Sequence, residues 1–193
     1  MRGFVYMTQT KILITDSSHF DPFAMAANLQ QGDIVILRDY ELEPQKRHNL
    51  ALALRKLTRQ KGLIFLVAKT PELAKQVNAD GIHLPEFMIS SARQIRAKHP
   101  NWLISCASHN FRASVRAKNA SADIILISPV FASPSDPKKK PLGIYKAKNM
   151  ALRGIFCACL GGVNKKTTKK IKNNIFQGLA GVSWGQKRGR IAT

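Results

Sequence analysis

The stretch SADIILISPVFASPSDPKKKPLG, residues 121–143, decides the fold. It begins with the apolar run 124–127 and passes directly into a loop with prolines, lysines and the hydroxyls of Ser133 and Ser135. A strand that is apolar throughout and then ends in a polar loop is typical of parallel α/β proteins, which bind ligands at the carboxyl ends of their strands. Taken alone, the stretch also fits a buried strand before an ordinary surface loop. The rest of the chain repeats the arrangement and favours the first interpretation.

Apolar runs alternate with helix-like segments along the whole chain. The predicted strands are residues 11–15, 33–39, 63–68, 81–86, 103–108, 124–131, 155–162 and 179–185. The predicted helices are residues 20–29, 44–59, 71–78, 91–99 with Ser90 as the cap, 111–119, 145–152 and 164–174. Eight strands in this alternation predict a compact α/β protein, a TIM (β/α)₈ barrel that forms a single domain over residues 1–193. The tail KRGRIAT is too short for a full closing helix, so either the last helix is short or absent or a partner subunit of a homo-oligomer covers its position.

Composition limits the class of protein further. The chain has 193 residues and is 45% hydrophobic, enough for a substantial core. No apolar run approaches the roughly 20 residues that cross a membrane, and the first residues lack a clean signal-peptide core, so we expect a cytoplasmic protein. Cys106, Cys157 and Cys159 all lie in apolar runs, which predicts reduced core thiols rather than disulfides or a zinc site.

The formal charge of +20 is the most unusual bulk feature. Such a charge can mark a nucleic-acid binder. The lysines and arginines are, however, spread along helix-like stretches such as 46–59 and 165–172, without a basic stripe interleaved with aromatic residues. We therefore interpret the charge as a lysine-rich solvated surface and do not expect a nucleic-acid partner. A basic field favours small anionic phosphate substrates.

Seven motifs, in order around the predicted strands, resemble one family. They are ILITD at 12–16, ILRD at 36–39, NADGIHLPE at 78–86, SCASHN at 105–110, SADIILISPVFASPS at 121–135, LGGVN at 160–164 and GLAGVSWG at 178–185. Over nearly its whole length the chain resembles the thiamine phosphate synthase/TenI superfamily of TIM barrels. The resemblance implies a synthase that joins hydroxymethylpyrimidine diphosphate to thiazole phosphate and releases pyrophosphate, with Mg²⁺ holding the diphosphate. TenI-type members are instead thiazole tautomerases, which need an acid/base side chain.

The resemblance also implies where phosphate groups bind. The matching positions are Arg38 for the diphosphate, Ser133 and Ser135 as the paired phosphate-loop hydroxyls, and Gly161, Gly162 and Ser183 for the thiazole phosphate. The loops after the last two strands of such barrels often form a phosphate site. The two glycines also fit a tight turn without a ligand, and Ser183 fits an ordinary strand hydroxyl.

Several catalytic positions depart from the family pattern. Val67 and Ala68 stand where the family has Asn-Asp, and Met88 stands where it has an acidic residue, so the usual ligands of the expected Mg²⁺ are missing. Other departures are Tyr40 and Asp136 for two lysines, Ala107 for a serine, and Pro129 for the catalytic histidine of the tautomerases.

The polar residues that remain near the strand ends are His83, Glu86, Lys69, Ser108 and His109. We predict catalytic roles for Arg38, Lys69 and Glu86, and substrate contacts for His83 and His109. Lys69 would replace part of the missing metal charge. The alternatives are a structural role for each histidine and plain solvation for Glu86. The resulting prediction is a transferase of the thiamine phosphate synthase type; the alternative is a TenI-like protein or a non-catalytic binder of thiazole phosphate or thiamine phosphate on a degenerate barrel.

Overall fold

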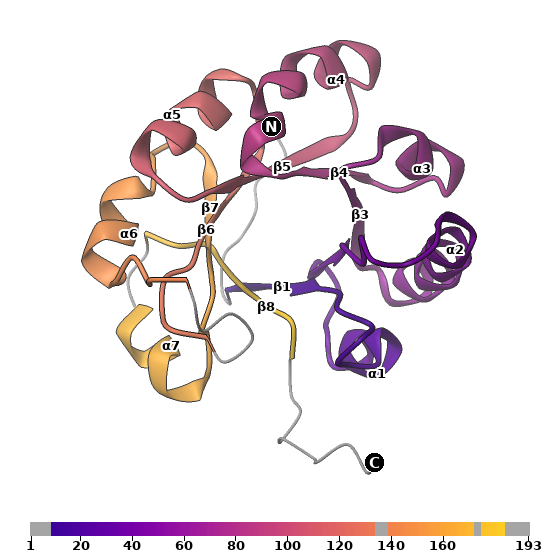
Figure 1. Cartoon of the computed structure of the whole chain (residues 1–193), viewed down its shortest axis with the longest axis horizontal. Helices are drawn as coiled ribbons and strands as arrows, with labels where there is room; N and C mark the ends of the chain where they lie inside the picture. The colour runs from indigo at the N-terminus through magenta and orange to yellow at the C-terminus, as the bar shows by residue number, and fades with distance from the viewer. Residues whose placement is uncertain (1–8, 134–138, 172–174, 184–193) are drawn as a thin grey trace.

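The computed structural model describes residues 9–133, 139–171 and 175–183, which form a closed barrel of eight parallel strands (Figure 1). Each strand pairs with the next along the chain, and β8 returns to pair with β1. The strands are β1 Thr10–Ile14, β2 Ile34–Leu37, β3 Ile64–Ala68, β4 Gly81–Leu84, β5 Leu103–Ser108, β6 Ile124–Ile127, β7 Phe156–Leu160 and β8 Gly178–Gly181. The predicted (β/α)₈ barrel is confirmed.

The helices lie outside the ring of strands (Figure 1). They are α1 Pro22–Ala27, α2 Pro44–Lys61, α3 Pro71–Gln76, α4 Ala92–Lys98, α5 Phe111–Asn119, α6 Ile144–Met150 and α7 Lys165–Ile171. Proline opens the first three, where its fixed φ and missing N–H suit a helix start. No helix in the described ranges is long and apolar enough to cross a membrane. The predicted lack of a full closing helix concerns residues 184–193, which lie outside the described residues.

A short 3₁₀ helix, η1 Glu86–Ser91, was not predicted from the sequence. It follows β4 and runs directly into α4, so Ser90 lies inside η1 and the prediction that it caps the next helix is wrong. Pro85 fixes an extended backbone before this turn, and Ile89 is its buried residue. A single apolar anchor has no 3.6-residue period, and for that reason the pattern of the sequence gives no sign of this element.

Alternate residues of the strands face the barrel interior, and nearly all of them are apolar. The interior cluster consists of Ile12, Ile14, Ile34, Ile36, Leu66, Ala68, Ile124, Leu126, Ala158 and Ala180. The residues between them, such as Leu13, Val35 and Phe65, pack against the helices. His83 is the register partner of the interior residue Ala68, and Ser105 is the partner of His83. Both polar side chains therefore face the interior, where both are buried.

The three cysteines are buried free thiols, as predicted. Cys106, Cys157 and Cys159 all lie on strands, and each packs in the apolar cluster between the strands and the helices. Burial raises the pKa of Cys106 and of Cys159 to about 12, which keeps both thiols protonated at neutral pH. They serve packing rather than chemistry.

At the amino end of the barrel, one kind of hydrogen bond is repeated four times. The residue just before each even-numbered strand offers a side-chain oxygen to a backbone N–H of the preceding odd-numbered strand, always at 2.8 Å. The pairs are Asp33 with Lys11, Asp80 with Phe65, Asp123 with Ile104, and Gln177 with Cys157. We call these four contacts the amino-end bonds.

Geometry explains why a side chain is needed there. The carbonyl of Phe65 accepts the N–H of Asp80, so the N–H of Phe65 points to the same side, at a level where β4 has not yet begun. The carboxylate of Asp80 occupies that place and satisfies the N–H. Ile104 and Cys157 repeat this reciprocal pair with Asp123 and Gln177. Without these side chains, buried N–H groups would be left without a partner.

The amino-end bonds predict a specific loss of stability. Asp80→Ala removes the acceptor for Phe65 N–H and for the guanidinium of Arg55, which donates to Asp80 at 2.8 and 2.9 Å. We expect the free energy of unfolding to fall by about 1–3 kcal/mol in urea denaturation, the cost of an unsatisfied buried donor. The matched control Glu41→Ala removes one exposed carboxylate and should change it by less than about 0.5 kcal/mol. Equal effects of the two variants would contradict this role.

Candidate active site at the carboxyl ends of the strands

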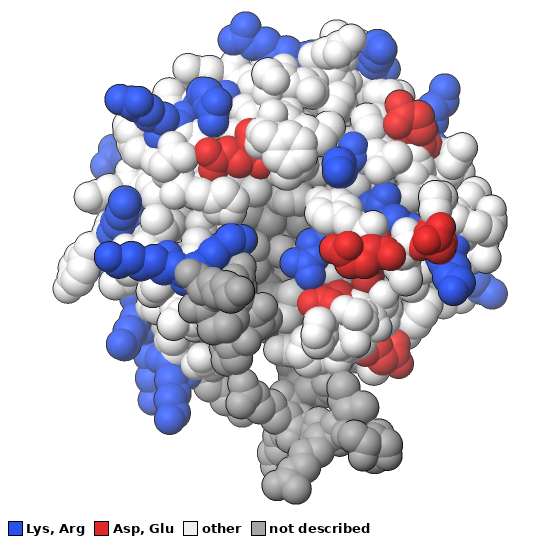
Figure 2. Space-filling model, viewed as in Figure 1, with Lys and Arg blue, Asp and Glu red and all other residues white. Residues whose placement is uncertain are grey.

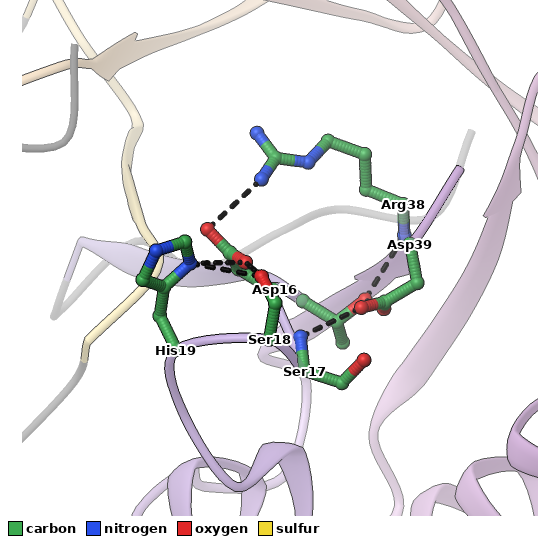
Figure 3. A network of polar contacts seen from close by, with 7 residues as sticks. Asp16, Ser17, Ser18, His19, Arg38 and Asp39 are labelled. Atoms are coloured by element: carbon green, nitrogen blue, oxygen red, sulfur yellow. Dashed lines mark hydrogen bonds and ion pairs between the residues drawn. The ribbon is translucent and has the colours of Figure 1, made fainter. Parts of the chain in front are cut away.

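Charged and hydroxyl groups join the loops that follow β1 and β2 (Figure 3). Arg38, the first residue after β2, places Nη2 at 3.2 Å from Oδ2 of Asp16. The same carboxylate accepts a hydrogen bond from Ser18 Oγ and contacts Nδ1 of His19. Burial of Asp16 opposes its ionisation, but the bonds from His19 and Ser18 and the charge of Arg38 outweigh it and lower the pKa of Asp16. Asp16 is therefore an anion that holds Arg38 at the mouth of the barrel.

Asp39 fixes the backbone of the same two loops (Figure 3). Its buried carboxylate accepts hydrogen bonds from Thr15 Oγ1 and, at 2.6 Å, from the backbone N–H of Ser17. Thr15 Oγ1 in turn accepts the N–H of Arg38 at 3.0 Å. The side chain of Arg38 extends from this network toward solvent, with 42% of it exposed. The fixed backbone of the two loops thus presents the guanidinium of Arg38 to a ligand that enters the barrel.

Lys69 follows β3 with a φ of +71°, in the left-handed region that lysine rarely adopts. Arg47 of α2 holds this turn, because its Nη2 donates to the carbonyl of Ala68 at 2.8 Å and its Nη1 donates to Thr70 Oγ1 at 3.0 Å. The N–H of Lys69 donates to the carbonyl of His83 at 2.9 Å. Arg47 is buried, whereas Lys69 is exposed. The turn therefore displays the ammonium of Lys69 at the strand ends.

Tyr40 lies among three cations on this side of the mouth. Lys69 Nζ and Arg47 Cζ each lie 5.6 Å from the centroid of its ring, within the range of cation–π attraction. Burial raises the pKa of Tyr40, although the charges of Arg47 and Arg38 oppose this. The phenol stays neutral at physiological pH and does not cancel the charge of its neighbours.

His83 lies inside the barrel below these cations. Its Nδ1 is 3.0 Å from Ser105 Oγ, which is also buried. Burial, and secondly the charge of Arg38, lowers the pKa of His83 from 6.5 to about 4. The imidazole is neutral at pH 7, so it can exchange hydrogen bonds with a ligand but adds no charge. Arg38 lies two positions beyond the interior residue Ile36, so the alternation of the strand places it above the same interior.

Glu86 opens η1, and the loop after β5 uses its carboxylate. Oε2 accepts the backbone N–H of His109 at 2.7 Å, and Oε1 accepts Nδ2 of Asn110 at 2.9 Å. Arg116 lies 3.6 Å from the same Oε1. Of the two readings that the sequence left open, plain solvation does not describe this side chain. Its contacts suit a positioning residue that fixes His109.

His109 is oriented by Ser128, the residue that follows β6. Nδ1 lies 2.8 Å from the carbonyl oxygen of Ser128 and 3.2 Å from its Oγ. Because a carbonyl can only accept, Nδ1 carries the proton. The second ring nitrogen, Nε2, has no bond to any described residue. Ser108, the other hydroxyl candidate here, bonds instead to Asn110 and Ser114 of the α5 region.

Gly161 and Gly162 follow β7 with φ of +94° and +64°. A Cβ at Gly162 would lie 2.3 Å from the carbonyl oxygen of Ala132, and one at Gly161 would lie 2.9 Å from Pro129. The loop after β6 approaches so closely because the N–H of Phe131 donates to the carbonyl of Gly161 at 3.0 Å. This contact is by itself a sufficient reason for both glycines, in line with the tight-turn alternative.

The three serines of the predicted phosphate cradle differ in what the structure describes. Ser133 is partly buried at the start of the loop after β6. Ser135 lies outside the described residues. Ser183 is exposed two residues beyond the end of β8. The structure thus brings Gly161 and Gly162 against the segment that leads to Ser133, and the cradle itself stays a prediction.

The residues present do not fit a protein-bound Mg²⁺ ion. The described ranges contain no group of three Asp, Glu, His or Cys side chains placed to hold a metal. Ala68 is buried at the end of β3, and Met88 packs against an apolar cluster outside the barrel. The carboxylates nearby, Asp16, Asp39 and Glu86, bind protein groups instead. Mg²⁺ in such enzymes is held by one or two carboxylates together with substrate phosphates.

Sequence reasoning missed three residues of this region, Asp16, Asp39 and Arg47. Asp16 and Asp39 are each the second residue after a strand, and two acids in these matching places were a signal for a pair of joined loops. Arg47 was hidden among the cations of α2, but it shares the spacing of the buried positions Ala51, Leu54 and Thr58. That spacing marks it as a buried cation, which must find acceptors.

Figure 2 shows the molecule in the view of Figure 1, with Lys and Arg side chains at the top, left and right of this face. The fold and the mouth define a class: a TIM barrel with cationic and neutral hydrogen-bonding groups at the carboxyl ends of its strands. The family model described as thiamine monophosphate synthase matches residues 11–184. The chain belongs to this family.

Known members cover most of the chain. The thiamine-phosphate synthase of Methanococcus maripaludis is 27% identical over 176 residues, which is 89% of this chain and 84% of the relative. That of Methanoculleus marisnigri is also 27% identical, over 93% of this chain and 84% of the relative. The solved structure of a thiamine phosphate pyrophosphorylase from Pyrococcus furiosus superposes with a TM-score of 0.73 at 18% identity, covering 90% of this chain and 85% of that one. At this identity the superposition supports the fold alone.

The lowered pKa of His83 predicts how stability depends on pH. A histidine with a folded pKa of about 4 and an ordinary value of 6.5 binds its proton preferentially in the unfolded state between these values. Stability from this group is therefore complete above pH 6.5 and is lost as pH falls toward 4. The loss should be on the order of 3 kcal/mol.

Urea denaturation at several pH values checks this, with His83→Gln as the comparison. Glutamine can still bond to Ser105 but does not titrate, so its profile should be flatter between pH 6.5 and pH 4. Asp16 does not contribute to the change in stability between pH 6.5 and pH 4. Its pKa is lowered in the folded protein, so its effect on stability falls below its ordinary value of 3.8. Identical slopes for the two proteins would contradict the assignment.

Proposed function

We propose that this barrel is a transferase of the thiamine phosphate synthase type. It would join hydroxymethylpyrimidine diphosphate to thiazole phosphate and form thiamine phosphate. In this reaction the bond between the pyrimidine methylene carbon and the diphosphate oxygen breaks, and the electron pair leaves with pyrophosphate. The same carbon forms a bond to the thiazole nitrogen. The observation that carries the proposal is Arg38, which the Asp16 and Thr15 contacts hold at the mouth in the position that the family uses for the diphosphate.

Stabilisation of the leaving group falls to the β2–β3 side of the mouth. Arg38 and Lys69 both follow strands there, and charge develops on the pyrophosphate as its bond to carbon breaks. Fixed cations aimed at developing charge are an effective source of catalysis, because they need no reorganisation during the reaction. The neutral His83 would contact the pyrimidine part without adding charge.

Binding of the thiazole phosphate falls to the β6–β8 side. The backbone N–H groups of Gly161 and Gly162 would contact the phosphate, and Ser133, Ser135 and Ser183 would supply hydroxyls. His109 lies between the two sides, with Nε2 as the nitrogen for a substrate contact. Glu86 would act through His109 rather than on the substrate, because its oxygens hold the His109 loop.

Turnover of both substrates tests the proposal. The full chain should form thiamine phosphate and pyrophosphate, and Arg38→Ala should lower kcat/KM by about 10²–10³, the usual loss for one group that stabilises transition-state charge. Arg153→Ala removes an exposed arginine from the segment between α6 and β7, which leads into the amino end of β7, and should retain full activity. No product from the unaltered protein at saturating substrates would overturn the proposal.

A further inference from the structure

We propose that the diphosphate subsite of this barrel works without a magnesium ion held by the protein, and that Lys69 together with Arg38 supplies the positive charge. This role for Lys69 rests on the proposed function, because it concerns the leaving group of that reaction. It follows from three features of the described residues: an apolar side chain at the interior position 68, the backbone of Lys69, and the pairing of the neighbouring charges.

The carboxylate that would bind a metal is missing from an interior position. Ala68 lies in register with His83, and both face into the barrel. A methyl group stands there, buried among apolar side chains. Since Mg²⁺ needs at least one protein oxygen in addition to the phosphates to be held by the enzyme, only the diphosphate itself could carry the ion here.

The backbone of Lys69 indicates that its position is imposed. A φ of +71° is unfavourable for any residue with a Cβ, and glycine would relieve it. Arg47 is buried to hold this turn, and its Nε has no partner among the described residues. The positive φ of Lys69 and the burial of Arg47 both cost stability, and together they place one ammonium beside the strand ends.

The charges around the subsite are not equally free. Asp16 pairs with Arg38, while none of the ion pairs among the described residues includes Lys69. Tyr40, the nearest ring, is neutral. An incoming anion would therefore interact with the charge of Lys69 without competition from a neighbouring carboxylate. Free pyrophosphate carries more negative charge than its magnesium complex, so a subsite built of fixed cations should prefer the free anion.

Calorimetry of the full chain with inorganic pyrophosphate tests this directly. We expect binding in excess EDTA, and no gain in affinity when excess MgCl₂ replaces EDTA. Binding that appears only with MgCl₂ would overturn the inference, and so would a large gain in affinity with the metal.

Variants of Lys69 test whether its charge contributes to pyrophosphate binding. Lys69→Ala should weaken pyrophosphate binding in EDTA about tenfold, equivalent to about 1.4 kcal/mol. The control Lys75→Ala removes an exposed lysine from the last turn of α3, at the opposite end of that helix from Lys69. It should bind as the unaltered protein does. Equal affinities of Lys69→Ala and the unaltered protein would contradict the proposed role of Lys69.

Lys69→Gly provides a second readout that does not depend on activity. It should raise the midpoint of urea unfolding, because glycine accepts the positive φ, and should weaken pyrophosphate binding as alanine does. A glycine variant that binds as tightly as the unaltered protein would overturn the inference. Metal-independent binding without any turnover would overturn the proposed function alone, whereas turnover with metal-dependent binding would overturn this inference alone.

Discussion

Closure of the barrel fixes the geometry of its mouth, and the amino-end bonds hold the register of four of its strand pairs. Strands that close on themselves must keep one stagger, and a slip of one residue would turn every inward side chain outward. Asp80 and Asp123 each satisfy the N–H and the carbonyl of one residue on the neighbouring strand. A slipped register would leave both of these backbone groups without a partner. Because the register holds, His83 and Ser105 face the interior.

The two ends of the barrel divide stability and chemistry between them. At the amino end each carboxylate has a matched donor, as Asp80 has in Phe65 and Arg55. At the carboxyl end the chain accepts a lysine at positive φ and a buried arginine with an unpaired Nε. Strain of this kind persists only where the surrounding structure imposes it. A TIM barrel can tolerate this strain at its mouth because the opposite end and the apolar interior stabilise the fold.

The sequence predicted the strands well because each is a short apolar run bounded by polar residues. It could not place η1, which has one apolar anchor, nor the burial of Arg47, whose acceptors include a backbone carbonyl that no sequence pattern marks. The candidate residues after the strands could be found because every parallel strand ends at the same face. Their pairing could not, since Glu86 and His109 meet only through the register of β4 and β5.

Charge separates the mouth into two halves. On the β1–β3 side, Arg38 and Lys69 surround a neutral Tyr40. On the β4–β7 side the contacts of His109 are hydrogen bonds to Glu86 and Ser128. Burial keeps His83, which lies between the halves, from adding a charge to either. A ligand with a strongly charged end would therefore be oriented by the cations, while its less charged part met the side that offers hydrogen bonds. A charged His83 would extend the positive field toward the second half, and the charged end of a ligand would then be placed less sharply.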